Sequence, residues 1–128
     1  MITMMYNILY TDNNKSIKTI IAGQIGTGTD LLFTIKDTNN DAVDLTGFTT
    51  YAKCYIGIEG SLVIDGEDLE VVSAEAGTYK YTIQSTDFIT SSYNDIELVF
   101  ADNATFASAT KVITASNCKL IIKDSLIS

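Results

Sequence analysis

The sequence lacks histidine, proline and tryptophan altogether among its 128 residues. Without histidine, neither a Ser-His-Asp nor a Cys-His catalytic arrangement can form, and the usual ligand sets of a zinc hydrolase are excluded as well. Basic residues are also few, with eight against sixteen acidic ones, and the net charge is −8. Because no basic cluster is present to neutralise a phosphate backbone, nucleic acid is not expected as a partner.

Long apolar runs are missing too, so no segment can span a bilayer and no membrane partner is expected. The opening MITMMYNILY carries no Lys or Arg and is interrupted by Thr3 and Asn7, so it lacks the layout of a signal peptide. We therefore expect a soluble protein made in a cytoplasm. A single domain is expected over residues 1–128, because a chain of this length buries roughly two-thirds of its unfolded surface.

Cysteine is scarce, and the two that occur, Cys54 and Cys118, lie far apart in the sequence. Their spacing fits no zinc motif. Each belongs to a segment of alternating apolar residues, so both thiols are expected to point into a core as small apolar groups. Two buried free thiols are the leading interpretation, and a disulfide between two sheets is the alternative.

The sequence does contain many short segments in which apolar and polar residues alternate. Ile, Val and Thr recur throughout, and short alternating segments are separated by clusters of Gly, Asn, Asp and Ser. This pattern predicts an antiparallel immunoglobulin-like β-sandwich of about eight or nine short strands. One helical turn is allowed at 85–88, where Ser85 or Thr86 would provide the cap. Strands are predicted at residues 2–10, 16–22, 31–36, 49–58, 68–74, 79–83, 96–100, 104–113 and 117–124.

The stretch DTNNDAVDLTG, which begins at Asp37, is rich enough in oxygen-bearing side chains to suggest a calcium loop. An EF-hand loop needs Gly at its sixth position and Glu at its twelfth, whereas Ala42 and Phe48 stand there. The flanking segments are predicted strands instead of helices. A hairpin with its turn at TNND is therefore preferred, and a calcium site at Asp37, Asn39 and Asp41 is the alternative. No metal or other cofactor is expected.

The DLTG sequence that follows is expected to form a corner of the sandwich. Gly47 supplies the backbone freedom for the bend. Leu45 stands alone among polar neighbours and is predicted to plug the end of the core. The residues singled out for turn or core roles are Asp44, Leu45, Gly47, Gly77, Tyr79 and Tyr81.

Carboxylates offer the remaining route to catalysis. Glu67 with Asp68, or Asp95 with Glu97, would be the acid and nucleophile of a glycosidase. Adjacent strand residues face opposite sides of a sheet, and no aromatic subsite accompanies the second pair. The glycine-rich GQIGTGTD lacks the Lys-Ser/Thr ending of a phosphate-binding loop and is interpreted as a turn. No catalytic residue is therefore assigned, and the protein is not expected to be an enzyme.

Acidic residues concentrate between Cys54 and Tyr79, where no Lys or Arg occurs. One end or edge of the domain should therefore be strongly negative. Glu67 and Glu70 are candidates for docking a basic neighbour. The alternative is a solvated edge that discourages aggregation. The acids in this stretch are Glu59, Asp65, Glu67, Asp68, Glu70 and Glu75.

Residues 1–22 are predicted to form a hairpin of two strands joined by the polar turn TDNNK, with apolar residues on both faces. One face belongs to the core. The other is expected to be exposed and to contact an adjacent subunit or another protein. The interface candidates are Met4, Met5, Tyr6 and Ile8. The alternative is that both strands complete the sandwich.

Three stretches in a fixed order carry a resemblance to a known family: FTIKDTNNDAVDLTGFT, VIDGEDLEVVSAEAGTYKYTIQSTDF and YNDIELVFADNATFASATKVI, followed by a last strand CKLIIKD. This order resembles the N-terminal domain of phage baseplate upper proteins and related tail-fibre attachment domains. The family has a DLTG-like corner and a G-x-Y-x-Y-x-I strand, which here begins at Gly77. The resemblance covers residues 24–124.

The resemblance implies a non-enzymatic virion structural protein, made in the host bacterial cytoplasm, that acts as a docking or adaptor module in the tail, baseplate or neck. Its partners would be other virion proteins, and a homo-oligomer or symmetric ring is expected. A capsid decoration protein is one alternative. A carbohydrate-binding module is another, with a glycan held on exposed tyrosine rings. The tyrosines available are Tyr51, Tyr55, Tyr79, Tyr81 and Tyr93, of which Tyr79 and Tyr81 are expected to be mostly core.

Overall fold

The computed structural model describes residues 1–22, 28–84, 87 and 91–124, and in this part of the chain the prediction of an all-β fold is confirmed. The helical turn predicted at 85–88 and most of the GQIGTGTD stretch lie outside the described residues. A 3₁₀ turn, η2, spans Phe106–Ser108. The strands are β1 (Ile2–Tyr10), β2 (Ile17–Ile21), β3 (Thr29–Lys36), β4 (Tyr51–Ile58), β5 (Ser61–Asp68), β6 (Glu70–Ser73), β7 (Thr78–Ile83), β8 (Ser92–Ala101) and β9 (Lys111–Lys123).

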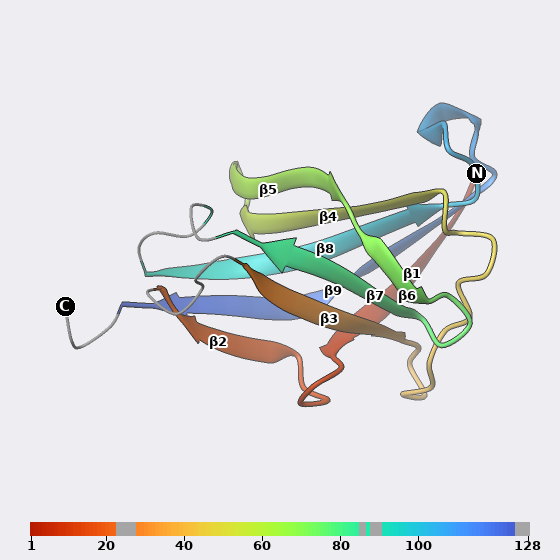
Figure 1. Ribbon diagram of the computed structural model, residues 1–128. Helices are drawn as coiled ribbons and strands as arrows, with labels where there is room; N and C mark the ends of the chain where they lie inside the picture. The colour runs from red at the N-terminus through yellow and green to blue at the C-terminus, as the bar shows by residue number, and fades with distance from the viewer. Residues whose placement is uncertain (23–27, 85–86, 88–90, 125–128) are drawn as a thin grey trace.

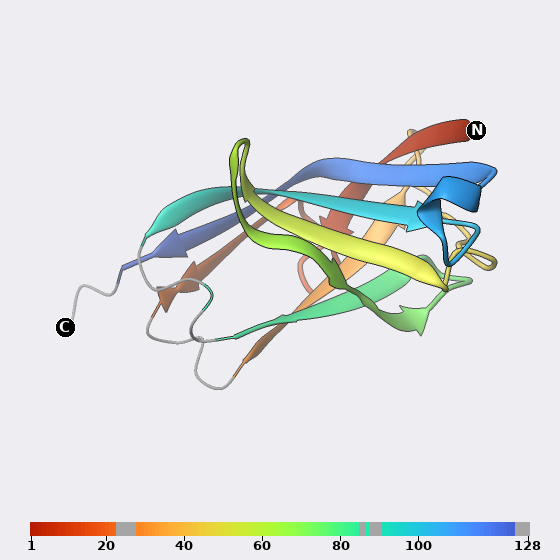
Figure 2. The same ribbon diagram turned by 90° about the horizontal axis from the view of Figure 1, so that it is seen from above.

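The strands form one curled sheet in the order β5-β4-β8-β9-β1-β3-β7-β6, with β2 also paired to β9. The curl brings β7 over β8, although the two strands are not neighbours in the sheet. The rings of Tyr79 on β7 and Phe100 on β8 are 4.8 Å apart between centroids. Figures 1 and 2 show the resulting layers, and the apolar core lies between them. No helix in the described residues is long and apolar enough to cross a membrane.

The two strands at the ends of the sheet order, β5 and β6, are consecutive in the chain. Leu69 alone separates them. Its side chain is buried, and its N–H donates a hydrogen bond to the Ala52 carbonyl at a distance of 2.9 Å. The chain therefore passes from one layer to the other at a single buried residue.

The N-terminal hairpin predicted from the sequence is wrong. Ile2–Asn7 pairs in parallel with β9, Asn7–Tyr10 then pairs antiparallel with β3, and β2 returns to pair in parallel with β9. The pairing is therefore not antiparallel throughout. By crossing between layers, β1 places Ile8 and Tyr10 in the core, so residues 1–22 are part of the curled sheet and not a separable arm.

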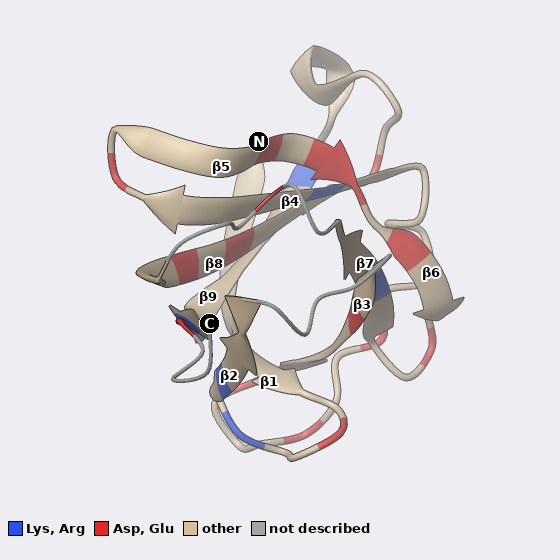
Figure 3. Ribbon diagram, turned by 60° about the vertical axis from the view of Figure 1, so that its left-hand side comes forward, with Lys and Arg blue, Asp and Glu red and all other residues tan. Residues whose placement is uncertain are grey.

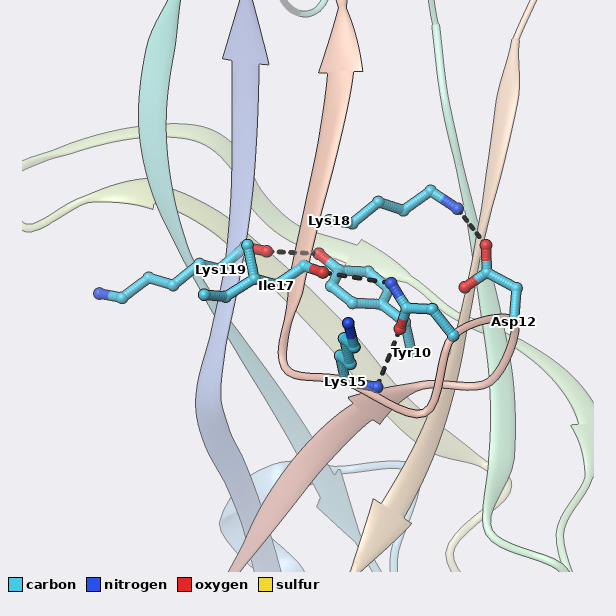
Figure 4. A network of polar contacts seen from close by, with 7 residues as sticks. Tyr10, Asp12, Lys15, Ile17, Lys18 and Lys119 are labelled. Carbon is cyan, nitrogen blue, oxygen red and sulfur yellow. Dashed lines mark hydrogen bonds and ion pairs between the residues drawn. The ribbon is translucent and has the colours of Figure 1, made fainter.

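A set of polar contacts holds this crossing in place (Figure 4). The buried Tyr10 hydroxyl donates a hydrogen bond to the Lys119 carbonyl at 2.9 Å. In the turn that follows, Asn13 Oδ1 accepts the Lys15 N–H at 2.9 Å, and Asn13 Nδ2 donates to the Ile17 carbonyl at 3.2 Å. These bonds direct the chain from the end of β1 back toward β9.

Two further strand predictions need correction. Residues 61–67 lie outside every predicted strand, yet they belong to β5, where Gly66 has a φ of +79° and accompanies an irregularity in the pairing with β4. The strand predicted at 104–113 begins only at Lys111, because η2 occupies Phe106–Ser108, and it continues without a break through the strand predicted at 117–124 as β9. Asn117, with a φ of +64°, accompanies a register shift opposite β8 instead of a turn. In both places a residue suited to turns forms a bulge, which bends a strand without ending it.

The loop after β3 is held by its own aspartate. Asp37 Oδ1 accepts the N–H groups of Asn39 and Asp41 at 2.9 and 3.0 Å, and Asn40 has a φ of +64°. This oxygen is therefore used in stabilising a turn. Among the described residues, no group of three or more His, Cys, Asp or Glu side chains is placed to hold a metal ion.

The DLTG corner packs against the chain between β6 and β7. Leu45 is fully buried, and its N–H donates to the Ala74 carbonyl at 2.8 Å. Asp44 Oδ1 accepts the Thr46 N–H at 2.9 Å, and Gly47 adopts a φ of +94°. The corner thus places one apolar side chain in the core while its polar neighbours remain exposed.

Cys54 and Cys118 are both buried and unlinked. Burial raises the pKa of both thiols, in the case of Cys118 to about 12. The Tyr10 hydroxyl lies close enough to Cys118 to influence its ionisation and favours the thiolate, but the effect of burial is larger. Both side chains therefore act as small core residues.

Candidate docking surfaces

The four N-terminal interface candidates do not share one environment. Ile8 is fully buried and must be removed from the set, because β1 has already turned into the core at that position. Met4 and Tyr6 are half-buried and pack against the core, and the Tyr6 hydroxyl contacts the Met4 sulfur. Met5 is 74% exposed. The surface available to a partner is therefore the outer side of the first half of β1.

Most of the acidic stretch lies on β5 and β6, which are the two end strands of the sheet order. Asp65, Glu67 and Asp68 are on β5, and Glu70 begins β6 (Figure 3). All four are exposed. We call these four residues the acidic surface. The step at Leu69 makes the two end strands neighbours in the chain. In the ladder with β4, Asp68 lies opposite Lys53 and Glu67 lies opposite the buried Cys54, so these two carboxylates face opposite sides of β5.

Two lysines from neighbouring strands partly neutralise the acidic surface, which its local sequence could not show. Lys53 on β4 forms an ion pair with Asp68 at 2.5 Å, and Lys80 on β7 forms one with Glu70 at 2.7 Å. These hydrogen bonds raise the pKa of each lysine. Glu67 has no ion-pair partner within the described ranges. It is therefore more available to a basic neighbour than Glu70.

A groove lies beside the β4–β5 hairpin and has a volume of about 390 Å³. Its walls combine apolar and acidic side chains, and Ile58 and Leu62 are 54% and 44% exposed. Asp95 also lines it and forms an ion pair with Lys119. Such a groove suits a side chain with an aliphatic stem and a cationic end. Its lining side chains are Tyr55, Ile58, Glu59, Leu62, Asp95 and Glu97.

The tyrosines do not form an obvious sugar platform. Tyr79 is fully buried, and Tyr81 is half-buried and packs against the core. Tyr51 stacks at an angle on Phe106, with 5.4 Å between the ring centroids, and Tyr55 is half-buried. Tyr93 is 74% exposed. A glycan would therefore meet one open tyrosine ring instead of a row.

Comparison with known proteins gives a match in structure but none in sequence. No family model matches the sequence, and no curated protein matches it either. Among solved structures, the N-terminal domain of phage TP901-1 ORF48 is similar, with a TM-score of 0.64 and 14% sequence identity. The match covers 96% of this chain and 99% of that chain. At this identity, the likeness shows a shared fold.

Proposed function

We propose that the chain is a non-enzymatic structural domain of a phage particle that acts as a docking or adaptor module in the tail, baseplate or neck. The observation that carries the proposal is the near-complete mutual coverage with a phage domain, 96% and 99%. The whole sandwich is matched, so the likeness is more than a shared pair of hairpins. The order of sequence motifs over residues 24–124 supports the same class independently. Fold alone does not assign function, so a direct test is needed.

The test is the protein content of purified particles of the phage that encodes the chain. Quantitative mass spectrometry should find its peptides in intact virions. A small number of copies per particle fits a tail, baseplate or neck position, whereas hundreds fit the alternative of a capsid decoration protein. Absence from virions that contain their other structural proteins would reject both positions.

Within this proposal, the acidic surface is the docking site for a basic segment of another virion protein. Glu67 is exposed and has no ion pair among the described residues, whereas Asp68 and Glu70 are each paired with a lysine. Complementary charges raise association rates and fix orientation more than they raise affinity. The contact should therefore weaken as salt increases.

Charge reversal tests the docking site. Particles assembled with Glu67→Lys should lose the chain at a lower salt concentration than wild-type particles. Glu70→Lys should have a smaller effect on partner contact, since Glu70 is already paired with Lys80. Asp41→Lys is the matched control, because it makes the same charge change in the exposed loop after β3. Equal salt profiles for Glu67→Lys and Asp41→Lys would exclude the acidic surface as the docking site.

A further inference from the structure

The first half of β1 leaves one of its two hydrogen-bonding edges open. Ile2–Asn7 pairs with β9 on one side, and pairing with β3 on the other side begins only at Asn7. Within the described residues, no strand pairs with the second edge of Ile2–Tyr6. Figure 2 shows this part of β1 at the outside of the molecule, beside β9.

The parallel ladder determines which main-chain groups face outward. The Ile2 N–H donates to the Thr110 carbonyl at 2.9 Å, so the main chain of Ile2 is directed toward β9. Successive residues of a strand direct their N–H and C=O groups to opposite edges. The N–H and C=O groups of Thr3 and Met5 are therefore directed away from β9. These are the groups that an added strand would bond.

The other edges of the sheet carry features that prevent pairing between molecules. β5 bears Asp65 and Glu67, and its register against β4 is irregular. β6 is four residues long and begins with Glu70, and β2 is five residues long and contains Lys18. By contrast, the first eleven residues, MITMMYNILYT, contain no charged side chain. The edge of β1 is thus the one described edge without such protection.

The exposed side chains next to this edge are uncharged, and two of them are large and apolar. Met5 is 74% exposed and Ile2 is 59% exposed. Each chain carries a net charge of −8, so two copies repel one another over most of their surface. An uncharged edge is where two such copies can meet without placing like charges together. We propose that Ile2–Tyr6 pairs antiparallel with the same segment of a second copy, about a twofold axis.

The alternation of β1 makes this pairing self-complementary. With the axis at Met4, Thr3 of each copy lies opposite Met5 of the other. Thr3 and Met5 are the residues whose main-chain groups face outward, so each such pair exchanges two N–H···O=C bonds. Met4 then lies opposite Met4 of the second copy, at a position without hydrogen bonds, where side chains approach most closely. The two sheets become one continuous sheet, and the dimer is closed.

Sedimentation equilibrium of the full chain over a range of concentrations tests the dimer. The wild type should shift from monomer toward dimer as concentration rises. Met5→Pro removes an outward N–H and leaves the bonds to β9 intact, so it should remain monomeric with an unchanged circular dichroism spectrum. Met5→Lys places a charge at the same edge without altering the main chain and should weaken the dimer, even if the proline variant fails to fold.

A cysteine at the axis provides a second readout. Under mild oxidation, Met4→Cys should form a disulfide-linked dimer, because Met4 faces itself across the axis. Ile17→Cys, on the exposed edge of β2, is the matched control and should stay monomeric. The native thiols are buried and should not contribute.

Three results would overturn the dimer. The first is a wild-type chain that stays monomeric at every concentration. The second is equal dimerisation by wild type and a folded Met5→Pro variant. The third is a monomer that binds another virion protein through this edge, shown by loss of that binding in Met5→Lys. The β1 edge does not include the acidic surface, so these outcomes leave the docking site proposed above to its own test.

Discussion

The hydroxyl of Tyr10 donates a hydrogen bond to the main-chain carbonyl of Lys119, at 2.9 Å, and so joins the end of β1 to the strand nearest the other end of the described chain. The Lys119 N–H in turn donates to the Ser16 carbonyl at 2.8 Å. The main chain of Lys119 therefore bonds both to the end of β1, through Tyr10, and to Ser16, the residue just before β2. The Tyr10 ring packs against Phe33, with 5.5 Å between centroids.

Removing this hydroxyl should weaken the crossing. Tyr10→Phe keeps the ring in place but removes the hydrogen bond that the hydroxyl donates to the Lys119 carbonyl, at an expected loss of about 1 kcal/mol in the free energy of unfolding. Urea denaturation at neutral pH measures the loss. Tyr93→Phe makes the same chemical change on an exposed side chain and should leave the midpoint almost unaltered. Equal midpoints for the two variants would show that the bond adds nothing to stability.

Leu45 should be essential to the corner of the sandwich. Its side chain is fully buried, so Leu45→Ala is expected to lose about 2 to 4 kcal/mol through lost burial and a remaining cavity. Leu62→Ala is the matched change at a side chain that is 44% exposed, and it should lose well under about 1 kcal/mol. Thermal and urea denaturation compare them. A Leu45 variant as stable as the Leu62 variant would contradict this role.

Substitutions at two glycines with positive φ distinguish the stability lost through backbone conformation from the stability lost through crowding. Gly47 has a φ of +94° with open space around it, so Gly47→Ala should lose about 1 to 2 kcal/mol from conformation alone. Gly77 has a φ of +66°, and a Cβ there would lie 2.5 Å from the Val43 carbonyl oxygen. Gly77→Ala should therefore lose clearly more, because the neighbouring chain must also move. Similar losses in the two variants, measured by urea denaturation, would refute the close approach.

Stability should fall in alkaline solution. Burial raises the pKa of Tyr79 and of Cys118 to about 12, whereas an unfolded chain releases these protons nearer the ordinary pKa values of 10.0 and 9.0. Above about pH 9, the unfolded state then binds fewer protons than the folded state, so the free energy of unfolding decreases as pH rises. The stability is fully present below the unfolded pKa values and is lost toward about pH 12.

A variant assigns part of this alkaline loss to one residue. Tyr79→Phe removes one of the groups with a raised pKa, so its stability should decline less steeply between about pH 10 and 12 than that of the wild type. Urea titrations at several pH values give both slopes. Parallel slopes would mean that the Tyr79 hydroxyl ionises equally readily in the folded and unfolded states.

The all-β class and most strand positions could be predicted from the sequence, because alternation of apolar and polar residues is a local property. The corner at DLTG was also predictable from local sequence, since Leu45 is the only apolar residue of these four. Prediction from the local sequence was wrong at Gly66 and Asn117, where a strand continues through a bulge. A residue that accepts positive φ serves a turn or a bulge equally well, and which one forms depends on whether a partner strand continues beside it.

Partners distant in the sequence decided the rest. No local pattern indicates that β1 pairs in parallel with β9, since the two are joined through the whole domain and no short turn fixes their direction. The same is true of Lys53 and Lys80, which reach the acidic surface from neighbouring strands and leave Glu67 as its unpaired member. The sequence by itself determined which side chains are apolar, charged or flexible. Only the tertiary structure decided which edge of the sheet stays open, because an edge is defined by the strands that are absent beside it.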